Sequence, residues 1–294
     1  MALVFTAQWF RLGGMRCSPL NAALALFGRN KILLYKYLSL SSLSYKSIIC
    51  DQQVYFASVM SMNDPFEGLP SYKLPTRQEV KNHLIEKGAK RKNINKLLPR
   101  AMEDMRHNYD RARTVDEAYA SETGLLCMTP HRDNLLMWSH YADSHQGICI
   151  GFDIKRPYDV EFGVGYDVEY TEKYPEICLL QRDWLYTEAK VGRTLMNQQA
   201  REDLMTKQFY TKSKEWSYED EVRFVRPPYG EGVGLMPFPK SQIKEVIIGC
   251  RVPENKKEEI IALVTKHCPT TDIIQSHVSK HEYGLTFESL STAC

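Results

Sequence analysis

Residues 125–153 read LLCMTPHRDNLLMWSHYADSHQGICIGFD, and their pattern of apolar and polar side chains indicates a strand, a short helix and a second strand. The apolar run of residues 124–129 has the length of a buried strand. Asp133 and Asn134 are residue types that cap the N-terminus of a helix. A glycine then ends the helical part, and the alternating apolar residues of 148–152 predict the second strand.

The predicted helix between these strands carries several large rings close together. Leu136, Trp138, His140 and Tyr141 cannot all face one core at 3.6 residues per turn. We therefore expect some of these side chains to face a cleft or a neighbouring element. This helix is the first candidate for a functional surface.

The remaining segments are strand-like or helix-like without a regular repeat. Residues 76–120 are polar on all sides and contain two helical pieces, 78–85 and 94–113, which indicates a helical insertion or lid in a strand-rich fold. A long amphipathic helix is predicted over residues 184–214. Strands or strand edges are predicted at residues 32–38, 54–58, 160–170, 215–224, 243–249, 272–278 and 285–288, and a further helix at residues 253–267.

This order of segments predicts an α+β fold, with a mixed, mainly antiparallel sheet, continuous or split, and flanking helices. Residues 31–294 are interpreted as a single domain with the helical insertion at about residues 76–120. Residues 1–30 are interpreted as a poorly defined N-terminal extension. The first fifty residues contain no acidic side chain. This composition fits three interpretations: a transit-like leader, a membrane-touching arm, or a segment upstream of the true start. We favour the last.

The composition is that of an ordinary soluble globular protein. Hydrophobic residues make up 43% of the chain and charged residues 25%, and no apolar run reaches the roughly 18 residues that cross a bilayer. The net charge of +2 is too small to indicate a nucleic-acid partner. The basic segment of residues 87–100 is interpreted as a solvated helix face rather than a phosphate-binding patch.

The cysteines and histidines give no indication of a metal site. The eight cysteines include no C-x-x-C pair, and several lie inside apolar strand patterns, so free thiols in a reducing cytoplasm are expected. His131, His140 and His145 lack the i, i+4 spacing of a helical metal pair. The sequence also lacks Walker, HExxH and nucleophile-elbow motifs, which leaves the common NTPase and hydrolase classes without support.

Two polar motifs remain as candidates for a site. Alternation on a strand through residues 215–224 places Glu219, Glu221 and Arg223 on one face. Either Arg223 neutralises a carboxylate on an exposed strand, or the two carboxylates meet a cation such as the oxocarbenium-like sugar formed when a glycosidic bond to nicotinamide breaks. The turn of residues 63–67, Asn-Asp-Pro-Phe-Glu, is either structural or a loop that contacts a ligand.

Six short blocks resemble, in order, the bacterial domain-of-unknown-function family 2971, over about residues 31–250. The blocks are LYKY from Leu34, YFAS from Tyr55, NDPFE from Asn63, MWSHYAD from Met137, GICIGFD from Gly147 and WSYEDEVR from Trp216. The resemblance implies a bacterial protein and brings no established activity with it.

A second, more distant similarity is to ADP-ribosyltransferase folds, which form an NAD pocket in a split sheet. The similarity places Lys36 at the basic position of the first strand, residues 128–129 with the helix that follows at the central position, and residues 219–221 at the late E-x-E position. The chain departs from the pattern in two respects. Lysine replaces the usual arginine or histidine, and the Ser-Thr-Ser signature is absent.

This similarity implies a set of site residues. Glu221 would stabilise the positive sugar and Glu219 would orient the acceptor. Aromatic rings would stack on nicotinamide, and Lys36 would neutralise a phosphate or bond the ribose. The implied catalytic residues are Glu221, Glu219 and His140, and the implied NAD-binding residues are Lys36, Tyr37, Trp138, Tyr141, Asn63 and Asp64.

Two classes of function follow as expectations. The first is an NAD-dependent ADP-ribosyltransferase or NAD glycohydrolase of the cytoplasm, with NAD as a substrate, an unidentified acceptor and, by the resemblance, a role in stress or phage defence. The second is a non-catalytic sensor or partner-binding module, in which the ring-bearing helix and the turn of residues 63–67 form a recognition groove. A protein acting on nucleic acid has less support, and a membrane partner has none.

Overall fold

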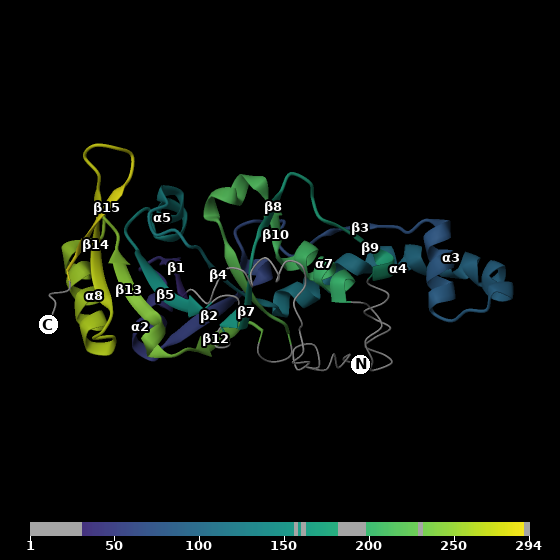
Figure 1. Cartoon of the computed structure of the whole chain (residues 1–294), viewed down its shortest axis with the longest axis horizontal. Coiled ribbons are helices and arrows are strands. Elements are labelled where there is room, and N and C mark those ends of the chain that lie inside the picture. Colours follow the sequence, from purple (N-terminus) through teal and green to yellow (C-terminus); the bar gives the residue numbers. More distant parts are fainter. Residues whose placement is uncertain (1–30, 156–157, 160–162, 182–197, 229–231, 291–294) are drawn as a thin grey trace.

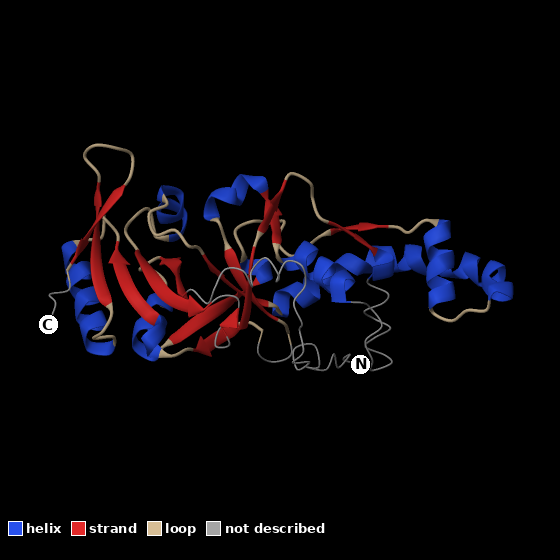
Figure 2. Cartoon of the chain, in the orientation of Figure 1, coloured by secondary structure: helices blue, strands red, loops and turns tan. Residues whose placement is uncertain are grey.

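A computed structural model of the chain describes residues 31–155, 158–159, 163–181, 198–228 and 232–290. The predicted extension of residues 1–30 and the first part of the predicted helix 184–214 lie outside these residues. Helices and mostly antiparallel strands combine in one chain, so the predicted α+β fold is confirmed (Figure 2).

The first sheet has five strands in the order β1-β5-β13-β14-β15. β13 and β14 run parallel and are joined by α8 (Glu254–His267), whereas the other neighbours are antiparallel. The sheet is therefore mixed, as predicted, because parallel neighbours need such a crossover. Its strands are β1 (Lys31–Leu38), β5 (Ile148–Lys155), β13 (Ile243–Ile248), β14 (Asp272–Val278) and β15 (Leu285–Ser289).

The second sheet has six strands in the order β12-β2-β4-β11-β7-β6. Its central pair is β4 and β11, with Met128 opposite Val222. β4 is covered on both faces, which explains its uninterrupted run of apolar residues. The strands are β12 (Gly234–Pro237), β2 (Gln53–Ser58), β4 (Gly124–Met128), β11 (Val222–Arg226), β7 (Gly163–Asp167) and β6 (Tyr158–Asp159).

The two sheets meet at one pair of residues and separate beyond it. The amide of Tyr35 donates to the carbonyl of Thr129 at 2.7 Å, and the amide of Thr129 donates to the carbonyl of Tyr35 at 3.0 Å. Across the described ranges, no strand of the first sheet is a ladder partner of a strand of the second. The sheet is thus split between β1 and β4, which is one of the two predicted forms.

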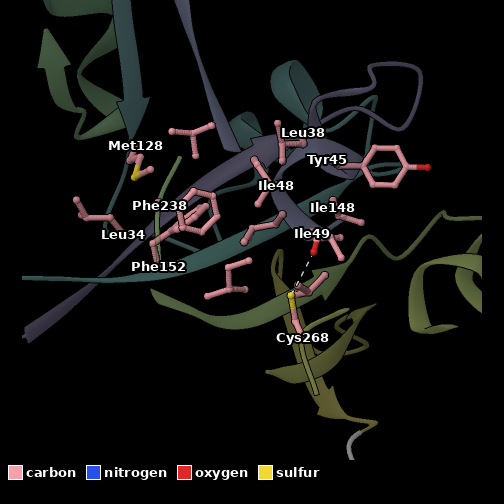
Figure 3. Close-up of a cluster of buried hydrophobic side chains, with 14 of the residues drawn as sticks. Leu34, Leu38, Tyr45, Ile48, Ile49, Met128, Ile148, Phe152, Phe238 and Cys268 are labelled. Carbon is pink, nitrogen blue, oxygen red and sulfur yellow. Dashed lines mark hydrogen bonds between the residues drawn. The ribbon is translucent and has the colours of Figure 1, made fainter. Parts of the chain in front are cut away.

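The main hydrophobic core lies between the two sheets and two helices, α2 (Ser44–Asp51) and α8. Figure 3 shows Ile48 and Ile49 of α2 and Phe152 of β5 as members of this core; the thiol of Cys268 donates to the carbonyl of Ile49 at 3.4 Å. Alternate residues of β5 enter this core, while Cys149 faces the other side, which confirms the predicted alternation.

The other face of the first sheet is covered by α5 (Leu135–Tyr141), seen beside β1 and β5 in Figure 1. The helix begins where the sequence predicts, because the Asn134 side chain accepts hydrogen bonds from the amides of Leu136 and Met137. Trp138 is fully buried against Tyr37 of β1 in this second core. The sequence LLCMTPHRDNLLMWSHYADSHQGICIGFD therefore joins both sheets through one short helix.

The predicted helical insertion is present as α3 (Arg77–Glu86) and α4 (Ile94–Glu122), which extend away from both sheets (Figure 1). Thr76 caps α3 in a capping box with Glu79. The two helices share a small core that includes Val80 and Leu98. At the root of this arm, β3 (Ser71–Lys73) pairs with β9 (Glu176–Cys178). α4 continues to Glu122, past the predicted end near residue 113.

The segment before β11 differs from the prediction. α7 (Gln198–Phe209) ends early and is followed by β10 (Thr211–Ser213), which pairs with β8 (Glu169–Thr171). A 3₁₀ helix, η4 (Lys214–Glu219), then occupies the first half of the predicted strand 215–224. The predictions of a helix that continues to residue 214 and of a strand that starts at residue 215 were therefore wrong. The physical reason is tertiary: Lys212 is drawn into a buried cluster of carboxylates, a contact that helical periodicity does not encode.

Within the described residues, no helix is both long enough and apolar enough to cross a membrane. Cys50, Cys127, Cys149, Cys178, Cys250 and Cys268 are free thiols. Burial raises the pKa of Cys127 and Cys149, so these two thiols are protonated at neutral pH.

Candidate functional site

A pocket of about 310 Å³ opens where the two sheets part. Its wall combines β1, β2, β4, α5, the turn after β2, β10, η4 and the start of β11. This size lies in the range of small-molecule sites. Its lining is rich in rings and charges, and includes Tyr35, Lys36, Tyr37, Tyr55, Asn63, Glu67, Cys127, Tyr141, Lys212, Glu219, Glu221 and Arg223.

β1 supplies a basic side chain on the inner face of the split. Strand alternation places Lys36 on the same face as Leu34 and Leu38, both of which pack in the main core. The Lys36 amine lies 3.4 Å from the carbonyl oxygen of Cys127, and no ion pair of Lys36 is formed within the described ranges. Burial lowers the pKa of this amine. Lys36 therefore keeps hydrogen-bonding capacity for a ligand.

Three segments far apart in the sequence are joined by a chain of hydrogen bonds along the pocket. The amide of Asn63, in the turn after β2, donates to the hydroxyl of Tyr141 on α5 at 2.8 Å. That hydroxyl donates to one carboxylate oxygen of Glu219 at 2.6 Å. Burial, with the adjacent Glu219 carboxylate, raises the pKa of Tyr141, so its hydroxyl remains a donor.

The two acidic residues reach the pocket through a turn rather than along a strand. Glu219 is the last residue of η4, and Asp220 follows in the left-handed region with φ 43° and ψ 52°. Aspartate tolerates this region better than most residues. Both Glu219 and Glu221 line the pocket, on either side of this turn. Asp220 itself points to solvent and pairs with His131 at 3.0 Å.

Arg223 is the centre of a buried ion network. It is 1% exposed, and its guanidinium donates to both oxygens of Glu221, at 2.7 and 2.8 Å, and to both oxygens of Glu67, at 2.8 and 3.0 Å. A fifth bond goes to the carbonyl of Phe209 at 2.6 Å. These bonds use every N–H donor of the guanidinium, so its burial is fully compensated.

Lys212 adds a second buried cation to this network. Its amine lies 2.7 Å from Glu219, 3.4 Å from Glu67 and 3.6 Å from Glu221, and 4.6 Å from the ring centre of Trp216. Three carboxylates and two cations leave this buried set with a formal charge of −1. With Lys36 the formal charges of the whole lining balance, so the individual carboxylates are the groups that attract a positive charge on a ligand or one that develops during a reaction.

The neighbouring carboxylates differ in acidity. Burial opposes ionisation of both, but two bonds from Arg223 overcome it at Glu221 and lower its pKa to about 2. At Glu219 burial raises the pKa by more than the contacts with Lys212 and Tyr141 lower it, so the pKa of Glu219 lies above its ordinary value. Two neighbouring carboxyl groups whose pKa values are shifted in opposite directions are typical of sites where one group exchanges a proton and the other keeps a fixed charge.

This difference predicts how acid affects stability. The pKa of Glu221 is lower in the folded protein than its ordinary value of 4.5, so its stabilisation is present above pH 4.5 and is lost as the pH falls toward about 2. The unfolding free energies of the wild type and Glu221→Gln should therefore differ most above pH 4.5 and converge near pH 2. Urea titrations at several pH values measure this difference. A difference that stays constant from pH 7 to pH 2 would contradict the prediction.

The pocket collects six of the predicted site residues and leaves three outside. Lys36, Tyr37, Asn63, Tyr141, Glu219 and Glu221 line it.

The other three, Trp138, His140 and Asp64, do not contribute to the pocket lining. Trp138 is fully buried, its indole nitrogen donates to the carbonyl of Arg132 at 2.9 Å, and its ring packs edge-on against Tyr37. His140 is exposed on the surface of α5. Asp64 is buried and accepts a hydrogen bond from the amide of Phe66, which shapes the turn. Stacking of a ligand on Trp138 is excluded in this structure, because the indole has no free face.

Three charged residues of the pocket were not among the predicted site residues. Glu67 lies in the NDPFE turn, and the presence of a carboxylate in that motif was the available signal. Arg223 was considered only as a surface partner for the acids, whereas it is buried. Lys212 carried no signal, because the sequence around it continues a helical pattern.

Comparison with known proteins supports the family resemblance. Residues 137–224 match the model of a family described as "Protein of unknown function (DUF2971)". This range begins in α5 and ends in β11, so it includes Tyr141, Glu219 and Glu221 of the pocket. No curated protein and no solved structure matched the chain.

Proposed function

We propose that this pocket binds NAD or a closely related N-glycoside and breaks the bond between nicotinamide and ribose. The observation that carries the proposal is the meeting of Lys36 from the first strand, the Tyr141 hydroxyl and the carboxylates of the E-D-E sequence in one pocket at the split of the sheet. The similarity to ADP-ribosyltransferase folds implies Lys36 and the E-D-E residues in one pocket, whereas Trp138 and His140, which it also implies, do not line it. The carboxylates of the wall suit a reaction in which the ribose becomes positive.

The geometry favours Glu219 over Glu221 as the group that acts on the sugar, which reverses the roles implied by sequence. Both oxygens of Glu221 are held by Arg223, so its charge is already compensated. Glu219 accepts from Lys212 and from Tyr141, through one oxygen each, and its raised pKa suits proton exchange. Glu221 then serves to hold Arg223 and the wall in place.

The proposed reaction balances with water or an acceptor hydroxyl as the second substrate. The bond between C1′ of the ribose and the nicotinamide nitrogen breaks, and its electron pair leaves with nicotinamide as a neutral molecule. The incoming oxygen forms the new bond to C1′ and passes its proton to Glu219. Tyr37 and Tyr141 supply ring surfaces for nicotinamide, and Lys36 supplies a donor for phosphate or ribose oxygens.

Nicotinamide release from NAD by the purified chain tests this proposal. We expect release that saturates with NAD concentration and that stops when the protein is unfolded by heat. Chromatographic separation of NAD, nicotinamide and ADP-ribose gives the rate and the second product directly. Binding of NAD without release would remove the catalytic part of the proposal, and neither binding nor release would remove it entirely.

Lys36→Met is expected to raise the stability of the protein and to weaken NAD binding. Burial lowers the pKa of the Lys36 amine in the folded protein, so placing this side chain there is unfavourable, and its removal should raise the unfolding free energy by about 0.5–2 kcal/mol. The same change should weaken NAD binding by about tenfold, because it removes a hydrogen-bond donor. Chemical denaturation and calorimetric titration measure the two effects. Loss of stability together with unchanged affinity would contradict the role given to Lys36.

One observation favours the alternative of a non-catalytic binding module. Both oxygens of Glu219 are already hydrogen-bonded, and Arg223 is saturated, so the polar wall is satisfied without any ligand. Such a wall suits recognition by a rigid site as well as catalysis. The nicotinamide-release assay distinguishes the enzyme from the binding module, because a binding module would bind NAD and release no nicotinamide.

A further inference from the structure

A second cavity, of about 640 Å³, lies between the turn that follows α5 and the loop that joins β14 to β15. It shares no lining residue with the first pocket. One side is formed by His145, Cys250 and Arg251, and the other by the loop of residues 278–285. Its size is within the range of small-molecule sites.

The turn on one side of this cavity is held in an unfavourable backbone conformation. Asp143, Ser144 and His145 have φ values of 53°, 53° and 69°, so three successive residues with side chains are left-handed. Left-handed residues other than glycine usually occur singly, and each raises the free energy by roughly 1–2 kcal/mol. Conformations of this kind are concentrated at binding and active sites.

Close packing against the end of β13 stabilises the turn. The amide of Arg251 donates to the carbonyl of His145 at 3.1 Å, and the guanidinium lies 3.4 Å from the carbonyl of Ser144. Gly249 makes this approach feasible, since a Cβ atom there would lie 2.3 Å from the carbonyl oxygen of His145. The ring of His145 is stacked on Trp138 at 6.1 Å between ring centres. The turn therefore fixes both an imidazole and a guanidinium at the cavity.

His145 carries a second unfavourable feature. Its Nδ1 atom is buried and has no hydrogen-bond partner in the described part of the chain. A buried polar atom without a partner is rare in native structures and calls for an explanation. The strained turn and this buried atom belong to the same residue of the cavity wall.

The charges at the cavity identify the kind of ligand. Arg251 and Lys280 are cationic, His145 and His281 can donate hydrogen bonds, and Glu282 is the one carboxylate in its lining. Neither Arg251 nor Lys280 forms an ion pair within the described ranges. Val278 is 68% exposed and Tyr283 is fully exposed, so apolar surface lies beside the charges. A ligand with one strongly anionic end and an organic body matches both features.

We propose that this second cavity binds a small molecule carrying a phosphate group, with the phosphate against Arg251 and Lys280 and the organic part over Val278 and Tyr283. Arg251 and Lys280 belong to the two different sides of the cavity, and two cations suit an anion with several oxygens. This site is independent of the function proposed for the first pocket.

Calorimetric titration of the full chain with AMP, ribose 5-phosphate and pyrophosphate tests the proposal, with adenosine as the matched ligand that lacks phosphate. We expect saturable binding of at least one phosphate compound and binding of adenosine at least about tenfold weaker. The double variant Arg251→Gln, Lys280→Gln should weaken phosphate binding at least about tenfold. The control Lys256→Gln, Lys257→Gln, on α8, should leave it unchanged.

Lys36→Met distinguishes this site from the first pocket. Phosphate binding that survives Lys36→Met and is lost in the Arg251 and Lys280 variant supports the second site, whether or not NAD is cleaved. The proposal is overturned when no phosphate compound binds at concentrations up to about 10 mM, when the double variant binds as the wild type does, or when Lys36→Met alone abolishes binding.

Discussion

Replacing Arg223 by methionine is expected to lower the unfolding free energy by about 3–5 kcal/mol, because it leaves the carboxylates of Glu67 and Glu221 buried without their main partner. All three side chains are at most 5% exposed, so water cannot take the place of the guanidinium. The loss is a large share of the roughly 5–15 kcal/mol by which a domain is stable.

Chemical denaturation of the two proteins measures this effect. The matched control is Arg113→Met, which removes an exposed arginine that pairs with Glu117 at 3.0 Å, and it should change the unfolding free energy by no more than about 0.5 kcal/mol. Adding Glu67→Gln and Glu221→Gln to Arg223→Met should restore part of the lost stability, because it removes the uncompensated charges. Equal effects of Arg223→Met and Arg113→Met would contradict a buried network.

Glu219→Gln is expected to slow nicotinamide release from NAD by about 100-fold or more, while NAD still binds. The substitution keeps the shape of the side chain and an acceptor for Tyr141, but it removes the charge that stabilises the positive sugar in the transition state. Lys212 retains Glu67 and Glu221 as partners, so the fold should remain intact. The effect should therefore fall on kcat more than on KM.

The control for this substitution lies in the same 3₁₀ helix. Glu215→Gln changes an exposed glutamate of η4 and should leave the rate of nicotinamide release unchanged. Thermal unfolding of both variants shows whether the fold is preserved. A Glu219→Gln protein that releases nicotinamide at the wild-type rate would remove Glu219 from the reaction, and Glu221→Gln would then be the next variant to assay.

The parts of the fold that the sequence predicted well are those governed by local patterns. The strand through residues 124–129, the cap at Asn134 and the alternation in β5 depend on hydrophobic period and side-chain capping, and all three are confirmed. The helices of the insertion were predicted for the same reason. The strand order across the split could not be predicted, because β4 pairs with β2 and β11, which are distant in the sequence.

The pocket shows the same limit at the level of single residues. Glu219 and Glu221 were expected on one strand face, whereas Glu219 ends a 3₁₀ helix and Glu221 follows the left-handed Asp220, although both line one pocket. Trp138 was expected in the site because of its residue type, but a large apolar ring gains more from burial under the sheet. The partners of Arg223 come from three separate segments, which no local pattern links.

The central claim is that side chains from separate segments form one site for NAD at the split of the sheet. Calorimetric measurement of NAD affinity in Lys36→Met, Asn63→Ala and Tyr141→Phe tests it most directly, since these residues come from β1, the turn after β2 and α5. We predict that each substitution weakens NAD binding at least about fivefold, as expected for the loss of one hydrogen bond in a site. Wild-type affinity in all three variants, or no binding of NAD to the wild type, would contradict the account.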